Sequence, residues 1–166
     1  FANGAITGAF AQLYNAEGFS LKAARLFHNA QANMVADQMH EAGYEVLSRG
    51  GTAVRAGNTY RYYDIIVRVG DGTIVGVEVK TAWSDLLNPR GSQVDADVWV
   101  SKNGGEAVGQ EYKVSRVAYA GIDGPTGTKA SWAASALQAK LFAAGIPTIK
   151  WGEKGLADEP WLGPRR

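Results

Sequence analysis

The chain has 166 residues, a net charge of +1 and a composition that is 46% hydrophobic, which fits one globular domain. This charge balance excludes a global basic field for nucleic acid, so any such surface must be a local patch. The absence of cysteine excludes disulfides, thiolate zinc sites and a cysteine nucleophile. No apolar run approaches the roughly 18 residues of a membrane span, and no signal peptide is visible.

The first part of the chain divides into a linker and a long helix. Residues 1–19 are small, apolar and glycine-rich, so we expect a linker ahead of a domain over residues 20–166. The chain begins with Phe1 instead of methionine, which suggests a piece of a longer polypeptide. From Ser20, an N-cap residue type, apolar residues recur at three-to-four spacing as far as Gly43, a residue type that often ends helices.

Two apolar runs around a Gly-Asp-Gly turn predict a β-hairpin over residues 63–81. Its register decides which side chains meet, because successive side chains of a strand point to opposite faces. A three-residue loop, with Gly72 left-handed, collects the valines on one face and places Asp64 opposite Glu78. Lys80 then shares the face of the two carboxylates. A two-residue loop would mix valines with charges on both faces, so we predict the three-residue loop.

The remaining elements complete an α/β (α+β) fold, with a mixed sheet whose central hairpin is flanked by helices. The chain loses regularity after the hairpin, and the loop on the other side of the hairpin contains Arg55 to Asn58. Three tryptophans, Trp99, Trp132 and Trp151, are expected in the core. We expect strands over residues 44–47, 97–100, 112–120 and 146–151, and an amphipathic helix over residues 131–144.

The main candidates for catalysis are Asp64, Glu78 and Lys80. The two carboxylates can hold Mg²⁺ or Mn²⁺, with Zn²⁺ as an alternative, and such an ion neutralises a phosphate and lowers the pKa of an attacking water. The lysine can orient or deprotonate that water, or offset charge in the transition state. A plain ion pair between Asp64 and Lys80 is the alternative, worth at most about 1 kcal/mol if exposed.

The spacing alone does not select this site. A (D/E)-x-K triplet is expected about once by chance in a chain of this length. A second copy, Glu111-Tyr112-Lys113, follows Asp97 at the separation that joins Asp64 to the first copy. The buried context favours the first copy, because its strands are nearly all valine and isoleucine.

Other residues are weaker candidates. His28 and His40 lie twelve positions apart on different faces of the long helix, which argues against a shared histidine site and favours surface or packing roles. Trp83 lies in a loop, where it could stack on a base. Three arginines could contact phosphates and make binding salt-sensitive: Arg61, Arg68 and Arg90.

Residues 33–81 resemble the core of the PD-(D/E)XK nuclease superfamily, which includes restriction endonucleases and archaeal Holliday-junction resolvases. The resemblance rests on the helix ending in Ala42-Gly43-Tyr44, and on Asp64 followed by Val77-Glu78-Val79-Lys80-Thr81. It implies a restriction-endonuclease-like sheet, with Asp64 and Glu78 as metal ligands and Lys80 as the catalytic lysine. Many members add a glutamine after the lysine, for which Gln93 is the nearest match. A helical acid of the relatives would fall here at Gln31, Met34 or Asp37.

Residues 1–15, FANGAITGAFAQLYN, resemble the junction that precedes C-terminal toxin domains in bacterial Rhs and filamentous-haemagglutinin-type polymorphic toxins. Together the two resemblances imply a nuclease toxin of the contact-dependent growth inhibition type. Such a domain is secreted on a large protein, delivered into the cytoplasm of a neighbouring bacterium and neutralised at home by an immunity protein. DNA is the expected substrate. A tRNA-cleaving toxin of the same fold and a non-enzymatic binding module are the alternatives.

Overall fold

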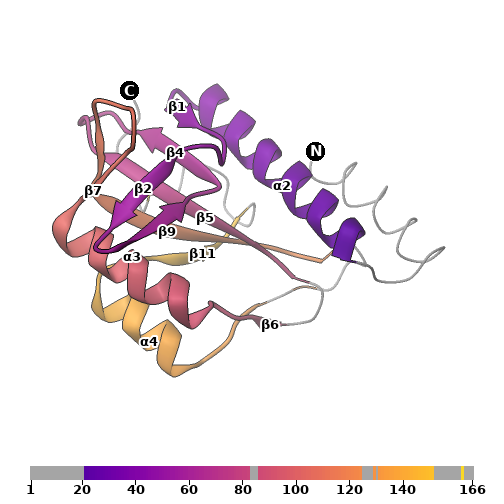
Figure 1. The fold of residues 1–166 in the computed structure, drawn as a ribbon. Coiled ribbons are helices and arrows are strands. Elements are labelled where there is room, and N and C mark those ends of the chain that lie inside the picture. The colour runs from indigo at the N-terminus through magenta and orange to yellow at the C-terminus, as the bar shows by residue number, and fades with distance from the viewer. Residues whose placement is uncertain (1–20, 83–85, 125–128, 130, 152–161, 163–166) are drawn as a thin grey trace.

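A computed structural model of the chain describes residues 21–82, 86–124, 129, 131–151 and 162. It has the expected α+β class, with a five-stranded mixed sheet at the centre (Figure 1). The strands are β1 (Glu45–Ser48), β4 (Ile65–Arg68), β5 (Ile74–Thr81), β9 (Arg116–Ile122) and β11 (Thr148–Lys150). In the order β1-β4-β5-β9-β11, the first two pairs are antiparallel and the last two are parallel.

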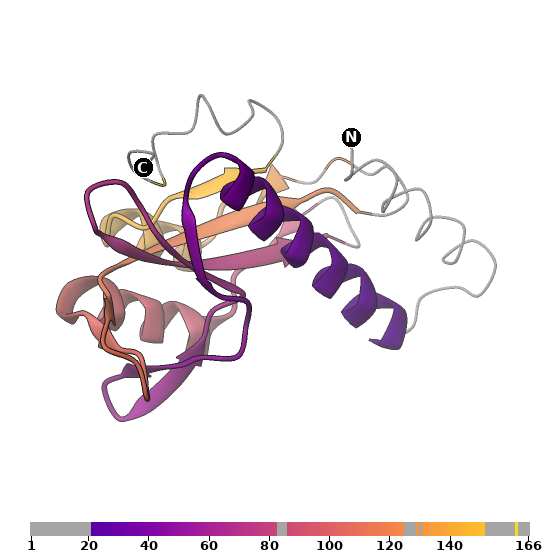
Figure 2. The same cartoon turned by 90° about the horizontal axis from the view of Figure 1, so that it is seen from above.

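Helices cover both faces of this sheet (Figures 1 and 2). One face packs against α2 (Leu21–Glu41). The other packs against α3 (Gly91–Asn103) and α4 (Ala136–Ala143), which lie on the crossovers between the parallel strands. Within the described residues, no helix combines the length and apolar character needed to cross a bilayer.

The hairpin of β4 and β5 has the predicted three-residue loop. Val69 N donates to Thr73 O at 2.9 Å, and Gly72 has a φ of 88°. This left-handed conformation favours glycine because it has no Cβ to clash with the backbone. Ile65 accordingly pairs with Val77, which fixes the register predicted from the segregation of the valines.

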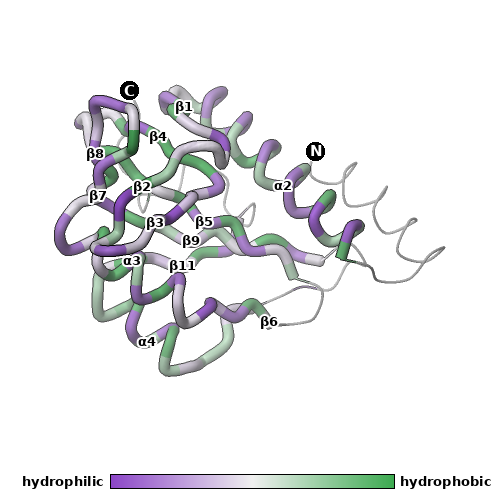
Figure 3. The backbone as a smooth tube through the Cα atoms, in the orientation of Figure 1, coloured by the Kyte–Doolittle hydropathy of each residue, from purple (hydrophilic) through white to green (hydrophobic). Residues whose placement is uncertain are grey.

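The segregation of side chains on the hairpin is also confirmed, and it explains why the sheet is buried on both faces. The α2 face collects Ile65 and the hairpin valines, whereas Ile66 and Ile74 pack on the α3 side. Figure 3 shows hydrophobic residues along the central strands, while α2 alternates between hydrophilic and hydrophobic along its length. Burial of apolar surface on both faces is what holds the hairpin rigidly in place.

Besides the central sheet, the described residues form three short two-stranded sheets. The pair β2 and β3 forms a second hairpin, which corrects the expectation of a loop at Arg55 to Asn58. Residues 131–132 form a strand, so α4 is shorter than predicted and begins after its N-cap Ser135. The short strands are β2 (Ala53–Ala56), β3 (Thr59–Tyr62), β6 (Leu86–Leu87), β7 (Gly105–Glu106), β8 (Lys113–Val114) and β10 (Ser131–Trp132).

The strand predicted over residues 97–100 is wrong, because these residues lie inside α3. Asp-Val-Trp-Val alternates as a strand would, but the buried positions of α3 follow helical spacing, with Asp97 and Val100 inside. Trp99 is correspondingly 37% exposed instead of lying in the core. The predictions for the N-cap Ser20 and for the linker over residues 1–19 lie outside the described residues.

Replacement of Gly76 by alanine should destabilise the protein by about 1–3 kcal/mol, since the added carbon overpacks a core position. A Cβ at Gly76 would lie 2.7 Å from ring carbon Cδ2 of Tyr63, which is fully buried. Chemical denaturation measures the effect. Gly51→Ala is the matched control, because a Cβ there meets nothing within 4 Å. Equal stability of the two variants would contradict the packing shown here.

Candidate active site

The hairpin register brings the two predicted carboxylates together at the end of β4 and β5 that lies away from the turn. Asp64 directly precedes β4 and stands opposite Glu78, because the next pair along is Ile65 with Val77. Asp64 Oδ2 accepts a hydrogen bond from Val79 N at 2.8 Å. The carboxyl groups of Asp64 and Glu78 also lie close enough for each to shift the pKa of the other.

Lys80 lies on the same face and is held by a residue of α3. Its Nζ donates to Gln93 Oε1 at 2.8 Å. Arg90, at the start of α3, is exposed and close enough to Lys80 for its charge to lower the pKa of the lysine. Lys80, Gln93 and Arg90, which were all named as candidates from the sequence, thus lie near the carboxylate pair, and their contacts with substrate stay predictions.

The structure adds His28 to this group, which corrects its expected surface or packing role. His28 lies on α2, and its Nε2 is 2.9 Å from Asp64 Oδ1. The spacing of His28 and His40 shows only whether the two histidines can meet each other. No local pattern in the sequence shows that the helix passes over the start of β4, where His28 meets Asp64. Asp37, considered as a helical acid, is exposed and pairs with Arg49 instead.

Arg61, predicted to contact phosphate, is instead buried beneath the site. Its Nη2 donates to Glu78 Oε2 at 2.6 Å, and its Nε donates to Asp97 Oδ1 at 2.8 Å. Asp97 is fully buried on α3 and also accepts hydrogen bonds from the hydroxyls of Tyr63 and Tyr119. Sequence reasoning missed this cluster because it placed Asp97 on a strand.

Of the two further predicted contacts, Arg68 is not brought to the site. Arg68 is the last residue of β4, at the turn end, and its Nη1 lies 2.7 Å from Glu45 Oε2. It lies four positions along the chain from Asp64, which corresponds to about 13 Å in an extended strand. Trp83 lies outside the described residues, so its stacking role stays a prediction.

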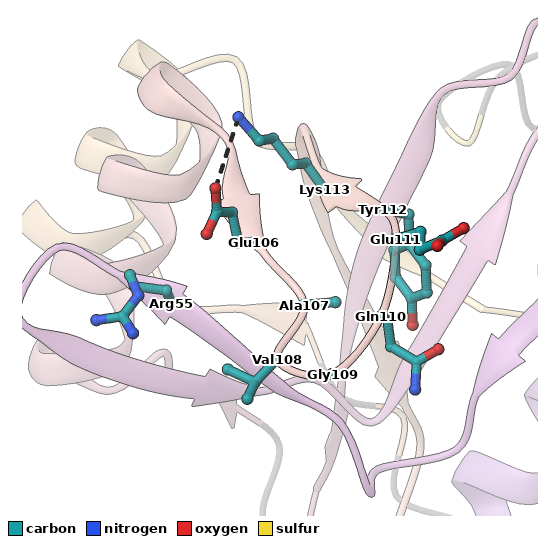
Figure 4. Close-up of a pocket in the computed structure, with 9 residues that line it drawn as sticks. All are labelled: Arg55, Glu106, Ala107, Val108, Gly109, Gln110, Glu111, Tyr112 and Lys113. Carbon is teal, nitrogen blue, oxygen red and sulfur yellow. Dashed lines mark ion pairs between the residues drawn. The ribbon is translucent and has the colours of Figure 1, made fainter.

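The second E-x-K copy does not form a comparable group. Lys113 and Glu111 are exposed at a pocket of about 460 Å³ beside β7 and β8. Figure 4 shows Lys113 reaching toward Glu106, with Nζ 4.0 Å from Oε1, and away from Glu111. The upstream aspartate of this copy is Asp97, whose carboxylate is committed to Arg61 in the core.

The surroundings shift the pKa values of Asp64 and Glu78 in opposite directions. Burial raises the pKa of Glu78 to about 8, and the hydrogen bond and negative charge of Asp64 act in the same direction. Burial also opposes ionisation of Asp64, but hydrogen bonds with His28 and Glu78 outweigh it and lower the pKa of Asp64. Burial lowers the pKa of Lys80. Such divergent shifts within one small cluster are typical of catalytic sites.

The residues present fit a divalent cation that is also bound by substrate and water. Among the described residues, no group of three His, Cys, Asp or Glu side chains is arranged as a complete metal cage. Mg²⁺ commonly binds through one or two carboxylates and completes its shell with waters and substrate phosphates. The adjacent carboxyls of Asp64 and Glu78 supply that donor set.

Comparison of the chain with protein-family models, curated proteins and solved structures finds no match.

The metal-free protein should lose stability as the pH rises from about 5 to 8. The pKa of Glu78 is raised from 4.5 to about 8, so over this range the folded state keeps a proton that the unfolded state has released. His28 acts in the same sense. Its hydrogen bond to Asp64 raises the pKa of the imidazole above 6.5, so its stabilisation is present below pH 6.5 and lost as the pH rises through the raised value.

Thermal unfolding in EDTA at several pH values measures this dependence. The lowered pKa of Asp64 acts only below its ordinary 3.8, outside this window. The lowered pKa of Lys80 has the opposite effect, because it makes stability increase with pH as far as pH 10.5. Lys80 is present in both the wild type and Glu78→Gln, so the difference between their pH profiles isolates the contribution of Glu78. The Glu78→Gln variant should show a clearly flatter profile between pH 5 and 8. Identical slopes would show that Glu78 carries no raised pKa.

Proposed function

We propose that this chain is a metal-dependent endonuclease that hydrolyses phosphodiester bonds of nucleic acid, with DNA as the favoured substrate. The observation that carries the proposal is the register of β4 and β5, which puts Asp64 and Glu78 side by side with Lys80 on the same face. This is the arrangement that the resemblance to PD-(D/E)XK nucleases implies. The mixed sheet with a central hairpin between helices is compatible with that family.

Each residue of the site has a proposed role. Asp64 and Glu78 would hold the divalent ion, Mg²⁺ or Mn²⁺ first, which supplies Lewis-acid stabilisation of the phosphate and a more acidic attacking water. Lys80 would accept a proton from the water or stabilise charge on the phosphate, and its lowered pKa makes the neutral amine more accessible near neutral pH. Gln93 would orient the lysine through their hydrogen bond, and the exposed Arg90 would contact a phosphate.

The bonding of Lys80 favours this reading over a plain ion pair. Within the described residues, the ion pairs of the hairpin end join Asp64 to His28 and Glu78 to Arg61, and none includes Lys80. The lysine instead donates to a neutral amide oxygen. A half-buried amine near two carboxylates, yet not bonded to either, is costly for stability and useful for catalysis.

The proposed biological setting rests on the resemblance of residues 1–15 to polymorphic-toxin junctions. The domain would be secreted on a larger protein, act in the cytoplasm of a target bacterium and be neutralised by a cognate immunity protein. Induced expression in a bacterium should arrest growth, and Lys80→Ala should abolish the arrest at equal protein level. Unchanged growth on expression of the wild-type chain at a detectable level would argue against a toxin.

Cleavage assays test the proposed activity directly. Purified protein is incubated with supercoiled plasmid and with total tRNA, in Mg²⁺, in Mn²⁺ and in excess EDTA. We expect plasmid cleavage with metal and none in EDTA. Cleavage of tRNA but not of plasmid would identify RNA as the substrate and would leave the assignment of the active site unchanged. Cleavage that persists in EDTA would exclude the metal mechanism, and no cleavage of either substrate with any metal would favour a binding module.

A further inference from the structure

A buried polar cluster lies directly behind Glu78, and the proposed chemistry does not use it. Its centre is Asp97 of α3, which is fully buried. Asp97 Oδ1 accepts from Arg61 Nε at 2.8 Å and from the Tyr63 hydroxyl at 2.7 Å. Asp97 Oδ2 accepts from Arg61 Nη2 at 3.1 Å and from the Tyr119 hydroxyl. Four donors therefore saturate this carboxylate.

The cluster also contacts one carboxyl oxygen of Glu78, the candidate metal ligand. Arg61 Nη2 donates to Glu78 Oε2 at 2.6 Å, and both side chains are only 7% exposed. The guanidinium also lies 4.7 Å from the centre of the Tyr63 ring. Because Asp97 holds Arg61 along one edge, through Nε and Nη2, and Tyr63 packs on one face, Arg61 has little freedom to follow Glu78 if the glutamate moves.

The hydrogen bond from Arg61 fixes one of the two oxygens of the Glu78 carboxyl group. Its Oε2 accepts the hydrogen bond from Arg61, on the side of the carboxyl group that faces the buried cluster. Without this partner the glutamate side chain would sample several rotamers. Partners that orient a metal ligand typically change metal affinity by 10- to 100-fold when removed.

We propose that Asp97 and Arg61 are positioning residues that fix Glu78 for metal binding, with Asp97 acting only through Arg61. The inference rests on the proposed function of the site, since it concerns the ligand Glu78. Arg61 is therefore not a substrate contact. It is the fixed base on which Glu78 is oriented. In this arrangement α3 supplies Asp97, and β3, which packs against α3, supplies Arg61.

Calorimetric titration of the full chain with Mn²⁺, free of nucleic acid, tests this inference. Asp97→Asn and Arg61→Lys should each bind Mn²⁺ at least about tenfold more weakly than the wild type. Lysine keeps the charge but cannot hold both carboxylates in one fork. The double variant should lose no more than about twofold beyond the weaker single variant, because the two residues act in series. In cleavage, kcat should fall while KM stays within about twofold.

Arg68→Lys is the matched control, because that arginine also pairs with a glutamate on the sheet but at the turn end. It should leave Mn²⁺ affinity unchanged. Variants with a lower melting temperature but wild-type Mn²⁺ affinity would show a structural cluster and overturn the inference. If Asp97→Asn fails to fold, Arg61→Lys decides alone. A wild-type chain that neither binds Mn²⁺ nor cleaves would instead refute the proposed function.

Discussion

Lys80→Ala should lower the rate of nucleic-acid cleavage by about 10²- to 10⁴-fold, the usual contribution of a positioned general acid or base. The fold should survive, because the bond that the structure gives the ammonium group is the one to Gln93. Removal of an amine whose pKa is lowered by burial should leave the melting temperature equal or higher. Rates of plasmid cleavage and thermal unfolding measure the two effects.

Lys113→Ala is the control offered by the chain itself. Lys113 belongs to the second E-x-K triplet, which has the same spacing from an upstream aspartate as the triplet of Lys80. Lys113 is exposed, however, and faces Glu106. Its replacement should leave the rate within about twofold. A loss of activity in Lys113→Ala, with none in Lys80→Ala, would transfer the site to the second copy.

Lys80→Arg separates the two roles that the lysine could have. Arginine keeps the positive charge but cannot give up its proton in a protein. If Lys80 deprotonates the attacking water, the arginine variant should be as inactive as the alanine variant. If Lys80 only stabilises charge, the arginine variant should recover a measurable part of the rate.

Asp64→Asn should abolish detectable cleavage, with a loss of at least about 10³-fold. The substitution keeps the size of the side chain but removes the carboxylate that would hold the metal, and with it several kcal/mol of charge stabilisation. Mn²⁺ affinity should fall in parallel. His28→Ala should have a smaller effect on metal affinity, about 10- to 100-fold, because it removes the partner of Asp64 Oδ1 and leaves the ligand in place.

Asp37→Asn provides the matched control for Asp64→Asn. Asp37 is an exposed carboxylate of α2 whose partner is Arg49, so its loss should change neither metal affinity nor rate. A rate for Asp64→Asn within a few fold of the wild type would contradict the assignment of Asp64 as a metal ligand.

The sequence was sufficient for those parts of the site that depend on strand alternation. A hairpin has few possible registers, and only one of them separates the valines from the charges. The predicted three-residue loop and the pairing of Asp64 with Glu78 follow from that count, and both are confirmed by the pairing of Ile65 with Val77. Gln93 was named as a candidate only through the resemblance, and its contact with Lys80 was not predicted.

The tertiary partners of the site could not be predicted in the same way. His28 reaches Asp64 across 36 positions, and Asp97 reaches Arg61 across the same separation. Such contacts depend on where α2 and α3 cross the sheet, which no local pattern specifies. The segment around Asp97 was also ambiguous in itself, because β-branched and aromatic residues at alternate positions are typical of strands.

One missed element did have a local signal. Gly57-Asn58 between two short alternating runs is a hairpin turn sequence, and β2 and β3 pair around it, with Gly57 at a φ of 69°. Recognition of this hairpin would have placed Arg61 on a strand, with Tyr60 and Tyr62 facing the other way. The inward direction of Arg61, and hence its place in the core, follows from that alternation.

The central claim is that Asp64 and Glu78 together bind a divalent metal ion on the shared face of the hairpin. The most direct measurement is the position of Mn²⁺ in crystals of the protein, located by its anomalous scattering. The account predicts a peak within bonding distance of a carboxyl oxygen from each residue, absent in the Asp64→Asn variant. An anomalous peak elsewhere, with none between Asp64 and Glu78 at saturating Mn²⁺, would contradict it.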